Sequence, residues 1–222
     1  MTSKKLFTLF LYIYIFGLYF ANTELNAKPT FLSGLVYISK YIASKDFIKL
    51  KQSNSDIELV DSIYITAVRY YESDISEALL CLTFALLPFN KMSIILPIVN
   101  IKITFPLLSA AEKIFSEKLK YQPKNIFFDS PTDDLGDKDK LSHFFGNAFL
   151  SYNVRFFNLS KFMGIFVELF EATLKIQGSI DHRDILTNYL GELFGKALKE
   201  NSKLLPSEVL KIYSLLFLRA NL

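Results

Sequence analysis

The fold is decided most directly by Asp184-Ile185-Leu186-Thr187-Asn188-Tyr189-Leu190-Gly191, which opens a helix predicted over 181–200. Its polar and small residues recur at helical spacing, so one face of the helix carries Asp184, Asn188, Gly191 and Gly195. A glycine in a helix interior costs about 1 kcal/mol relative to alanine. Two glycines on one face therefore predict that another helix backbone comes close at that face.

A second polar stretch begins the helix predicted over 138–157 and reads Asp139-Lys140-Leu141-Ser142-His143-Phe144. Asp139 and His143 are four residues apart and share one helix face. Lys140 is expected at the surface, in local ion pairs with Asp137 or Asp139. This face therefore supplies the side chains from which a site could be built.

Helices are predicted for most of the remaining chain. Two more follow in the carboxy-terminal third, over 160–177 and 206–219, and the short connections predict antiparallel neighbours. Apolar spacing predicts another over 56–71, and Asp74 with Glu77 resembles a capping box opening a helix that ends before Pro88. The stretch 79–89 is almost wholly apolar, and burial in the core is favoured over insertion into a membrane surface.

The stretch 92–107 differs from its surroundings. Pro97 and Pro106 bracket a run rich in β-branched residues, which predicts a short hairpin or an extended strap. An amphipathic segment follows over 109–119, and then a polar loop over 122–136. The predicted fold class is therefore mainly α: an antiparallel helical bundle with a short extended or hairpin segment near 94–106.

Residues 1–27 have the layout of a secretory signal peptide: a basic start, an apolar run over 6–20 and a polar end at Ala27. The run holds about fifteen residues, whereas a permanent span needs roughly twenty, so cleavage near Ala27 is favoured over an uncleaved anchor. The protein is therefore expected to be exported to the periplasm or cell envelope, with 28–222 as a single helical domain. No transmembrane helix is predicted after residue 27.

Composition narrows the class of protein further. Hydrophobic residues make up 51% of the 222-residue chain, which is enough for a large core, and Cys81 is the single cysteine, so no internal disulfide can form. A mean hydropathy of +0.27 indicates that some apolar surface meets a membrane or a partner. Basic residues are spread singly along the sequence, which argues against nucleic acid as a partner.

The two polar stretches together resemble the VanZ-like proteins and a related group of YfiM-like predicted envelope proteins. The resemblance covers about 137–198 and rests on Asp139, Lys140, His143, Phe144, Glu168, Asp184, Asn188, Gly191 and Gly195. It implies a helical module and an envelope setting, but no defined activity; glycopeptide resistance is the best-known association. The sequence departs from the family at Glu171, where a glutamine is usual, and in lacking several membrane spans.

Two interpretations of the polar residues follow. In the first, His143, Glu168 and Asp184 are catalytic candidates, and Asp139, His143 and Asp184 are candidate ligands for a divalent metal. In the second, which is favoured, His143 forms a hydrogen bond with Asp184 or Asn188 and ties two helices together. Known hydrolase signatures are absent from the sequence, and no cofactor is predicted.

The leading functional hypothesis is therefore a non-catalytic exported envelope protein whose helical module contacts a membrane surface, a lipid or a membrane-associated partner. The alternative is a metal-assisted hydrolase or transferase acting on a cell-wall or lipid intermediate. Whether the protein is an enzyme is left open by the sequence.

Overall fold

A computed structural model describes residues 29–96, 101–154 and 182–215. Contacts between residues divide the chain into two units, Met1–Thr30 and Phe31–Leu222, and every helix and strand described belongs to the second. The predicted signal peptide over 1–27 and the predicted helix over 160–177, with Glu168, lie outside the described residues.

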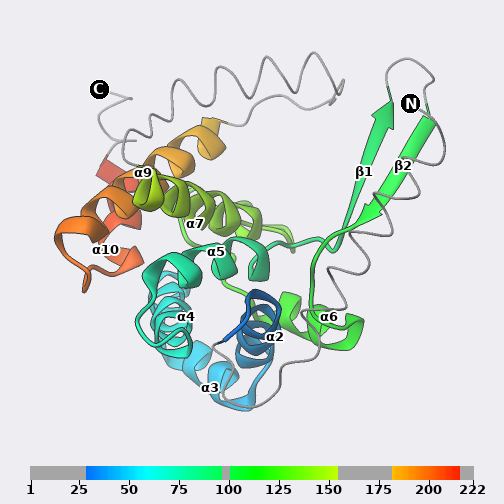
Figure 1. Cartoon of the computed structure of the whole chain (residues 1–222), viewed down its shortest axis with the longest axis horizontal. Helices are drawn as coiled ribbons and strands as arrows, with labels where there is room; N and C mark the ends of the chain where they lie inside the picture. Colours follow the sequence, from blue (N-terminus) through cyan, green and yellow to red (C-terminus); the bar gives the residue numbers. More distant parts are fainter. Residues whose placement is uncertain (1–28, 97–100, 155–181, 216–222) are drawn as a thin grey trace. The chain divides into compact units, whose positions relative to one another are not determined.

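The prediction of a mainly helical bundle with one hairpin is confirmed. The described helices are α2 (Phe31–Ile42), α3 (Lys45–Ser53), α4 (Asp56–Tyr70), α5 (Ile75–Ala85), α6 (Glu112–Tyr121), α7 (Lys138–Asn153), α9 (His182–Glu200) and α10 (Pro206–Leu210) (Figure 1). The two strands are β1 (Lys91–Leu96) and β2 (Ile101–Pro106), which pair antiparallel. No helix is predicted from the sequence over α2 and α3. Within the predicted helix over 206–219, α10 ends at Leu210, and helix resumes after Lys211 over 212–215, where the described residues end.

Helix α5 lies at the centre of the packing and contacts α2, α4 and α7. The side chain of Asp74 caps it by accepting a hydrogen bond from the backbone N–H of Glu77 at 3.1 Å, and the helix ends three residues before Pro88, as predicted. Leu79, Cys81 and Leu82 are fully buried in it. Burial in the core is therefore confirmed for the apolar stretch that begins at Leu79, although Phe89 at its end is exposed.

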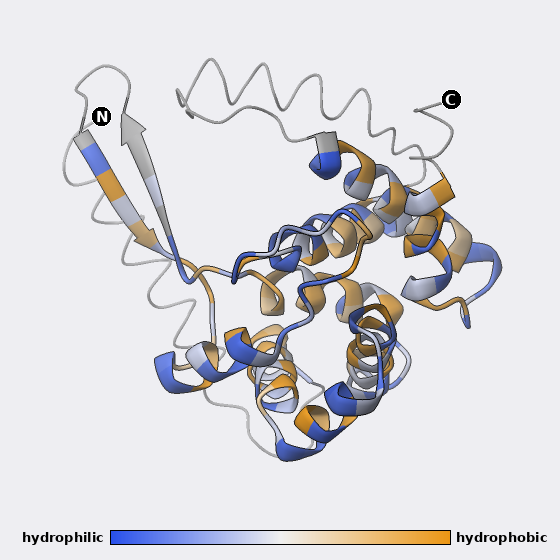
Figure 2. Cartoon of the chain, turned by 180° about the vertical axis from the view of Figure 1, so that it is seen from behind, coloured by the Kyte–Doolittle hydropathy of each residue, from blue (hydrophilic) through white to orange (hydrophobic). Residues whose placement is uncertain are grey.

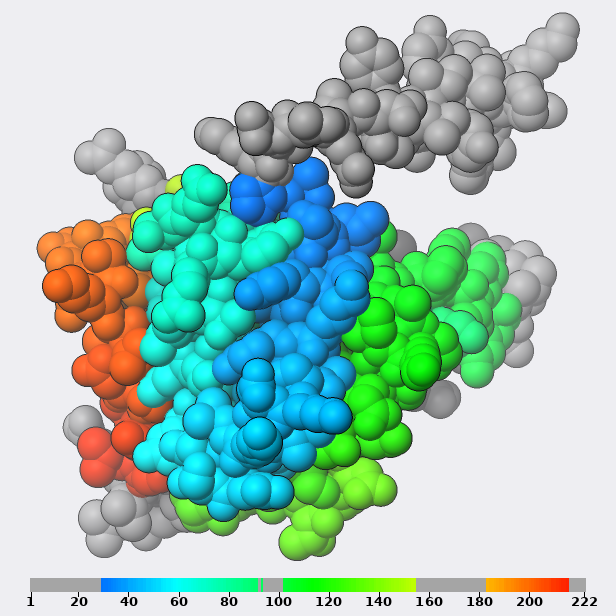
Figure 3. Space-filling model, turned by 90° about the horizontal axis from the view of Figure 1, so that it is seen from below, coloured from blue at the N-terminus to red at the C-terminus, as the bar shows by residue number. Residues whose placement is uncertain are grey.

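Helices α2 and α4 pack beside α5 and run antiparallel to each other. The hydroxyl of Tyr70 on α4 donates a hydrogen bond to Ser33 near the start of α2, while Tyr41 near the end of α2 meets Ser62 at 2.6 Å. Figure 3 shows α2, α3 and α4 side by side, with α6 on one flank and α10 on the other. Among the described residues, no helix is both long enough and apolar enough to cross a membrane.

Helices α7 and α9 run parallel, since successive contacts move toward the carboxy-terminal end of both helices. The two helices also pack closely. A Cβ atom on Gly191 would lie 2.2 Å from the backbone oxygen of Phe144, and one on Gly195 would lie 2.2 Å from that of Ala148. The close backbone approach that the two glycines predict is confirmed.

The hairpin lies to one side of the helices (Figure 1). Its register pairs Lys91 with Pro106 and Leu96 with Ile101, which confirms the predicted extended segment and identifies it as a hairpin. Hydrophilic and hydrophobic residues alternate along β2 (Figure 2). A backbone hydrogen bond from Leu107 to the Asn90 carbonyl at 2.8 Å closes its base beside α6.

Candidate functional site

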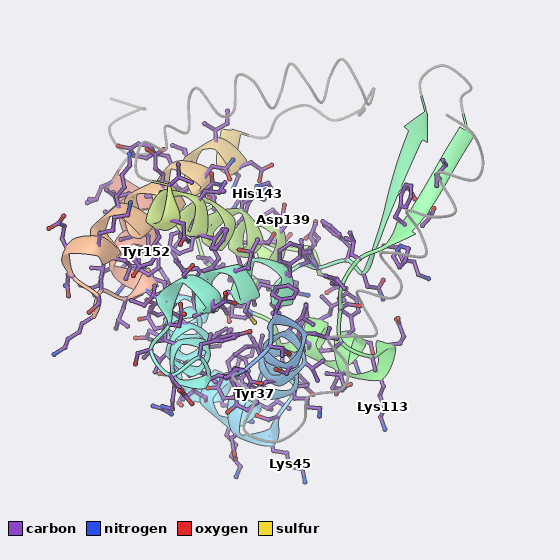
Figure 4. The ribbon with its side chains drawn as sticks, in the orientation of Figure 1. Tyr37, Lys45, Lys113, Asp139, His143 and Tyr152 are labelled. Carbon is purple, nitrogen blue, oxygen red and sulfur yellow. The ribbon has the colours of Figure 1, made fainter. Side chains whose placement is uncertain are left out.

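A cavity of about 650 Å³ lies between α5 and α7. Apolar side chains form most of its wall: Leu80, Phe84, Leu87, Phe89, Phe149 and Leu150. One edge is polar and carries Asp139, His143, Asn147 and Asn188. Figure 4 shows that Asp139 and His143 both come from α7. The sequence-predicted polar residues therefore border an apolar hollow, which the sequence analysis did not predict.

The polar edge is a hydrogen-bonded group centred on Asn188. Its Oδ1 accepts a hydrogen bond from Asn147 Nδ2 at 2.7 Å and lies 3.2 Å from His143 Nδ1. Asn147 Nδ2 also donates to the His143 carbonyl at 2.9 Å. Asn188 is buried, whereas 43% of the His143 side chain is exposed. The structure thus contains the helix-tying contact between His143 and Asn188, while His143 Nε2 lies 3.9 Å from Asp184 Oδ1.

Lys140 is buried, so its expected surface position is wrong, whereas the expected local ion pair with Asp139 is present. Its Nζ donates hydrogen bonds to Asp139 Oδ2 at 3.0 Å and to Asp184 Oδ1 at 2.5 Å. The long-range partner on α9 draws the side chain inward, and two carboxylates offset the cost of removing an ammonium from water. Helical spacing along α7 alone could not reveal this, because Asp184 belongs to another helix.

The same geometry bears on the metal-ligand candidates Asp139, His143 and Asp184. The Lys140 ammonium lies between the Asp139 and Asp184 carboxylates. It therefore occupies the position from which a metal ion would bind both of them. Within the described ranges, no group of three or more His, Cys, Asp or Glu side chains is arranged to hold a metal ion. The catalytic candidate Glu168 lies outside them, so the proposed trio with His143 and Asp184 is not brought together in the described residues.

Two acceptor atoms at the polar edge are buried without a hydrogen-bond partner among the described residues: Asp139 Oδ1 and Asn147 Oδ1. Buried acceptors are normally satisfied, so each has capacity for a donor from a bound molecule. Asn147 was missed by the sequence analysis, although its position four residues after His143 places it on the same helix face.

A second polar group, also missed, joins the starts of α7 and α9. Asp137 is fully buried and pairs with Arg183, and it also accepts hydrogen bonds from the backbone N–H groups of Ile126 and Phe127 at 3.1 Å and from the hydroxyl of Ser130. These donors come from the predicted loop over 122–136. The Asp137 carboxylate makes all of these contacts within the protein. Its role is therefore to hold the loop, α7 and α9 together rather than to contact a ligand.

Comparison of the chain with protein-family models, with curated proteins and with solved structures gives no match. The resemblance to VanZ-like and YfiM-like proteins therefore stays a prediction carried by its motif residues. The roles assigned to the residues at the cavity rest on their geometry: Asn188 and His143 tie helices, Lys140 joins two carboxylates, and Asp139 with Asn147 offers free acceptor capacity.

Proposed function

We propose that this protein is a non-catalytic envelope protein that binds an amphipathic molecule in the cavity between α5 and α7. The apolar wall takes a hydrocarbon chain, and the polar edge accepts hydrogen bonds from hydroxyl or amine groups at one end of the ligand. The observation that carries the proposal is the cavity itself, which combines an apolar wall with two buried acceptors that have no partner among the described residues.

The size and lining of the cavity support a small amphipathic ligand. Binding pockets for small molecules occupy roughly 300–1,000 Å³ and combine an apolar wall with a few placed polar groups. The volume of about 650 Å³ lies within this range. Burying a chain against Leu80, Leu87 and Leu150 would be favourable by about 0.8 kcal/mol for each CH₂ removed from water.

The polar edge favours a ligand that brings donors and no negative charge. Asp139 Oδ1 and Asn147 Oδ1 are acceptors, and the Asp139 carboxylate would repel an anionic group placed beside it. The Lys140 ammonium is already engaged with Asp139 and Asp184. A monoacylglycerol, with one chain and two hydroxyls, has the chemistry that such a site would recognise.

The envelope setting is part of the proposal and is supported by the sequence. The signal-peptide layout of 1–27, the mean hydropathy of +0.27 and the VanZ-like resemblance over 137–198 all favour export and contact with a membrane surface or an envelope partner. Mass spectrometry of the protein recovered from cells tests this directly. An amino terminus at Lys28 is expected, and an intact Met1 in a protein recovered from the cytoplasm would contradict it.

The binding test uses the fact that the chain has no tryptophan. A Phe89→Trp variant places one indole at the cavity, and a Phe128→Trp variant places one at an exposed position outside it. Titration with monolauroylglycerol below its critical micelle concentration should give a saturable blue shift in the first variant and none in the second. Equal responses, or no response in either variant, would contradict the proposal.

A second pair of variants tests the wall. Leu150→Asn, made in the Phe89→Trp background, should weaken monolauroylglycerol binding about tenfold, because a contact worth about 1.4 kcal/mol of hydrophobic free energy is lost. Leu32→Asn is the matched control, since Leu32 is 53% exposed and does not line the cavity.

Zinc, manganese and magnesium added without lipid test the metal-assisted alternative: a metal-dependent rise in melting temperature that His143→Ala abolishes would favour that alternative.

A further inference from the structure

A second cavity, of about 540 Å³, lies across residues 87–89 from the first. Leu87 and Phe89 line the cavity between α5 and α7, whereas Pro88 lines the second one. The second cavity is bounded by the end of α6, the loop before α7 and the first residue of α7. The second cavity is lined by lysines, whereas the wall of the first is mostly apolar.

Three lysines and one carboxylate line this second cavity: Lys120, Lys124, Lys138 and Asp134. Asp134 is fully exposed, and its Oδ1 lies 3.7 Å from Lys124 Nζ. Lys124 Nζ also donates a hydrogen bond to the Asp133 carbonyl at 3.1 Å. A solvated carboxylate at that distance neutralises little charge, so the cavity keeps a positive excess.

Lys138 is the least compensated of the three. It is buried, and its Nζ donates to the Asp134 backbone carbonyl at 2.7 Å, with no carboxylate in ion-pair range in the part of the chain that is described. Burial lowers the pKa of Lys138, and the charge of Lys124 lowers it further, while the charges of Asp134 and Asp133 act in the opposite direction without reversing the shift. Mutual repulsion between two ammonium groups is relieved when an anion binds between them.

We propose that this second cavity binds a phosphate-class anion, either free phosphate or the phosphate of a lipid headgroup. Lys124 and Lys138 supply the central charges, and Lys120 stands at the rim, where it also pairs with Glu117 at 2.8 Å. Ammonium groups act as strong point-charge donors to phosphate oxygens. The apolar lining from Pro88, Leu119 and Leu135 leaves room beside the anion for the carbon atoms of an ester.

The test measures binding of inorganic phosphate to the folded full-length protein by ³¹P line broadening at constant ionic strength. The wild type should broaden the signal saturably, and Lys124→Gln and Lys120→Gln should each weaken binding about fivefold or more, since a charge-assisted hydrogen bond is lost. Lys113→Gln and Lys45→Gln are the controls. Both lysines are exposed and project away from the helices (Figure 4).

Dihexanoyl phosphatidic acid, compared with dihexanoylglycerol, distinguishes the two sources. Equal affinity for phosphate and the phosphatidic acid assigns the site to free phosphate, whereas at least tenfold tighter phosphatidic acid binding assigns it to a lipid headgroup. The proposal is overturned if the folded wild type binds neither probe, or if Lys124→Gln and Lys113→Gln bind them equally. Monolauroylglycerol binding is measured separately, so failure at one cavity leaves the result at the other intact.

Discussion

Asn188 is the residue on which the polar edge of the first cavity depends. Its Oδ1 serves both His143 and Asn147, so one buried oxygen joins two positions of α7 to α9. His143 contributes less to stability than its place in the motif suggests, because much of its ring is in water and can hydrogen-bond there instead.

Alanine substitutions at these two residues should therefore differ in their cost. We expect Asn188→Ala to lower the free energy of unfolding by about 1–3 kcal/mol, because one of the two N–H groups of Asn147 Nδ2 loses its acceptor while the other keeps the His143 carbonyl. His143→Ala should cost about 0.5–1 kcal/mol, the usual net value of one partly exposed hydrogen bond. Urea unfolding of both variants checks the order, and a larger loss for His143→Ala would mean that the histidine does more than tie two helices.

The buried side chain of Lys118 should make the free energy of unfolding depend on pH. It is buried, and its Nζ donates hydrogen bonds to the carbonyls of Ala85 and Leu87 at 2.9 and 2.8 Å, where α5 ends. Burial, aided by the charge of Lys138, lowers the pKa of Lys118 to about 7. The unfolded chain keeps that proton up to about pH 10.4, so the unfolded state binds more protons between those two values. The contribution of Lys118 to stability must rise with pH in this window.

We expect the stability difference between the wild type and Lys118→Met to move in favour of the wild type from pH 7 to pH 10. The slope should not exceed about 1.4 kcal/mol per pH unit. Urea unfolding at pH 6, 8 and 9.5 provides the measurement. Lys113→Met, at an exposed position of the same helix, should show no such slope. Parallel curves for both variants would show that Lys118 titrates normally in the folded protein.

Among the helices, α7 and α9 are so close at Gly191 that backbone atoms of α7 limit how near α9 can come. Gly191→Ala would bring a methyl group against the Phe144 carbonyl, so the two helices would have to separate. We expect a loss of about 2–3 kcal/mol, at the upper end for overpacking. Gly146→Ala is the matched control, because its methyl group would lie 3.2 Å from the Thr83 side chain, which can shift. Equal thermal stabilities for the two variants would contradict this explanation.

The elements could be predicted from sequence where the determining forces are local. The helical spacing in 56–71 and 181–200, the Asp74 cap and the prolines around the hairpin all act over a few residues. The site could be predicted only in part. Spacing along one helix identifies Asp139 and His143 as neighbours, but the burial of Lys140 and the presence of two cavities depend on which helices meet, and that is set by distant parts of the chain.

At the scale of the whole molecule, the buried pair of Asp137 and Arg183 joins the loop over 122–136 to α7 and α9. Asp137→Asn removes the closer of two carboxylates that compensate the buried Arg183 guanidinium, the other being Asp129 with its Oδ2 at 3.5 Å from Arg183 Nε, so we expect a loss of about 3 kcal/mol. The double variant with Arg183→Met should lose less than the sum of the two single variants, because either single variant already breaks the ion pair between Asp137 and Arg183. Additive losses in urea unfolding would show that the two residues act independently.

Helix α7 cannot be covered by its parallel neighbour until α9 has been made, so the two helices must pack late in folding. Asp137 and Arg183 are 46 residues apart, so α7 is synthesised well before α9. During that interval the face of α7 that will receive the two glycines is open to water or to a chaperone. A chain truncated before residue 182 should therefore leave α7 open to protease, whereas the full chain should protect it.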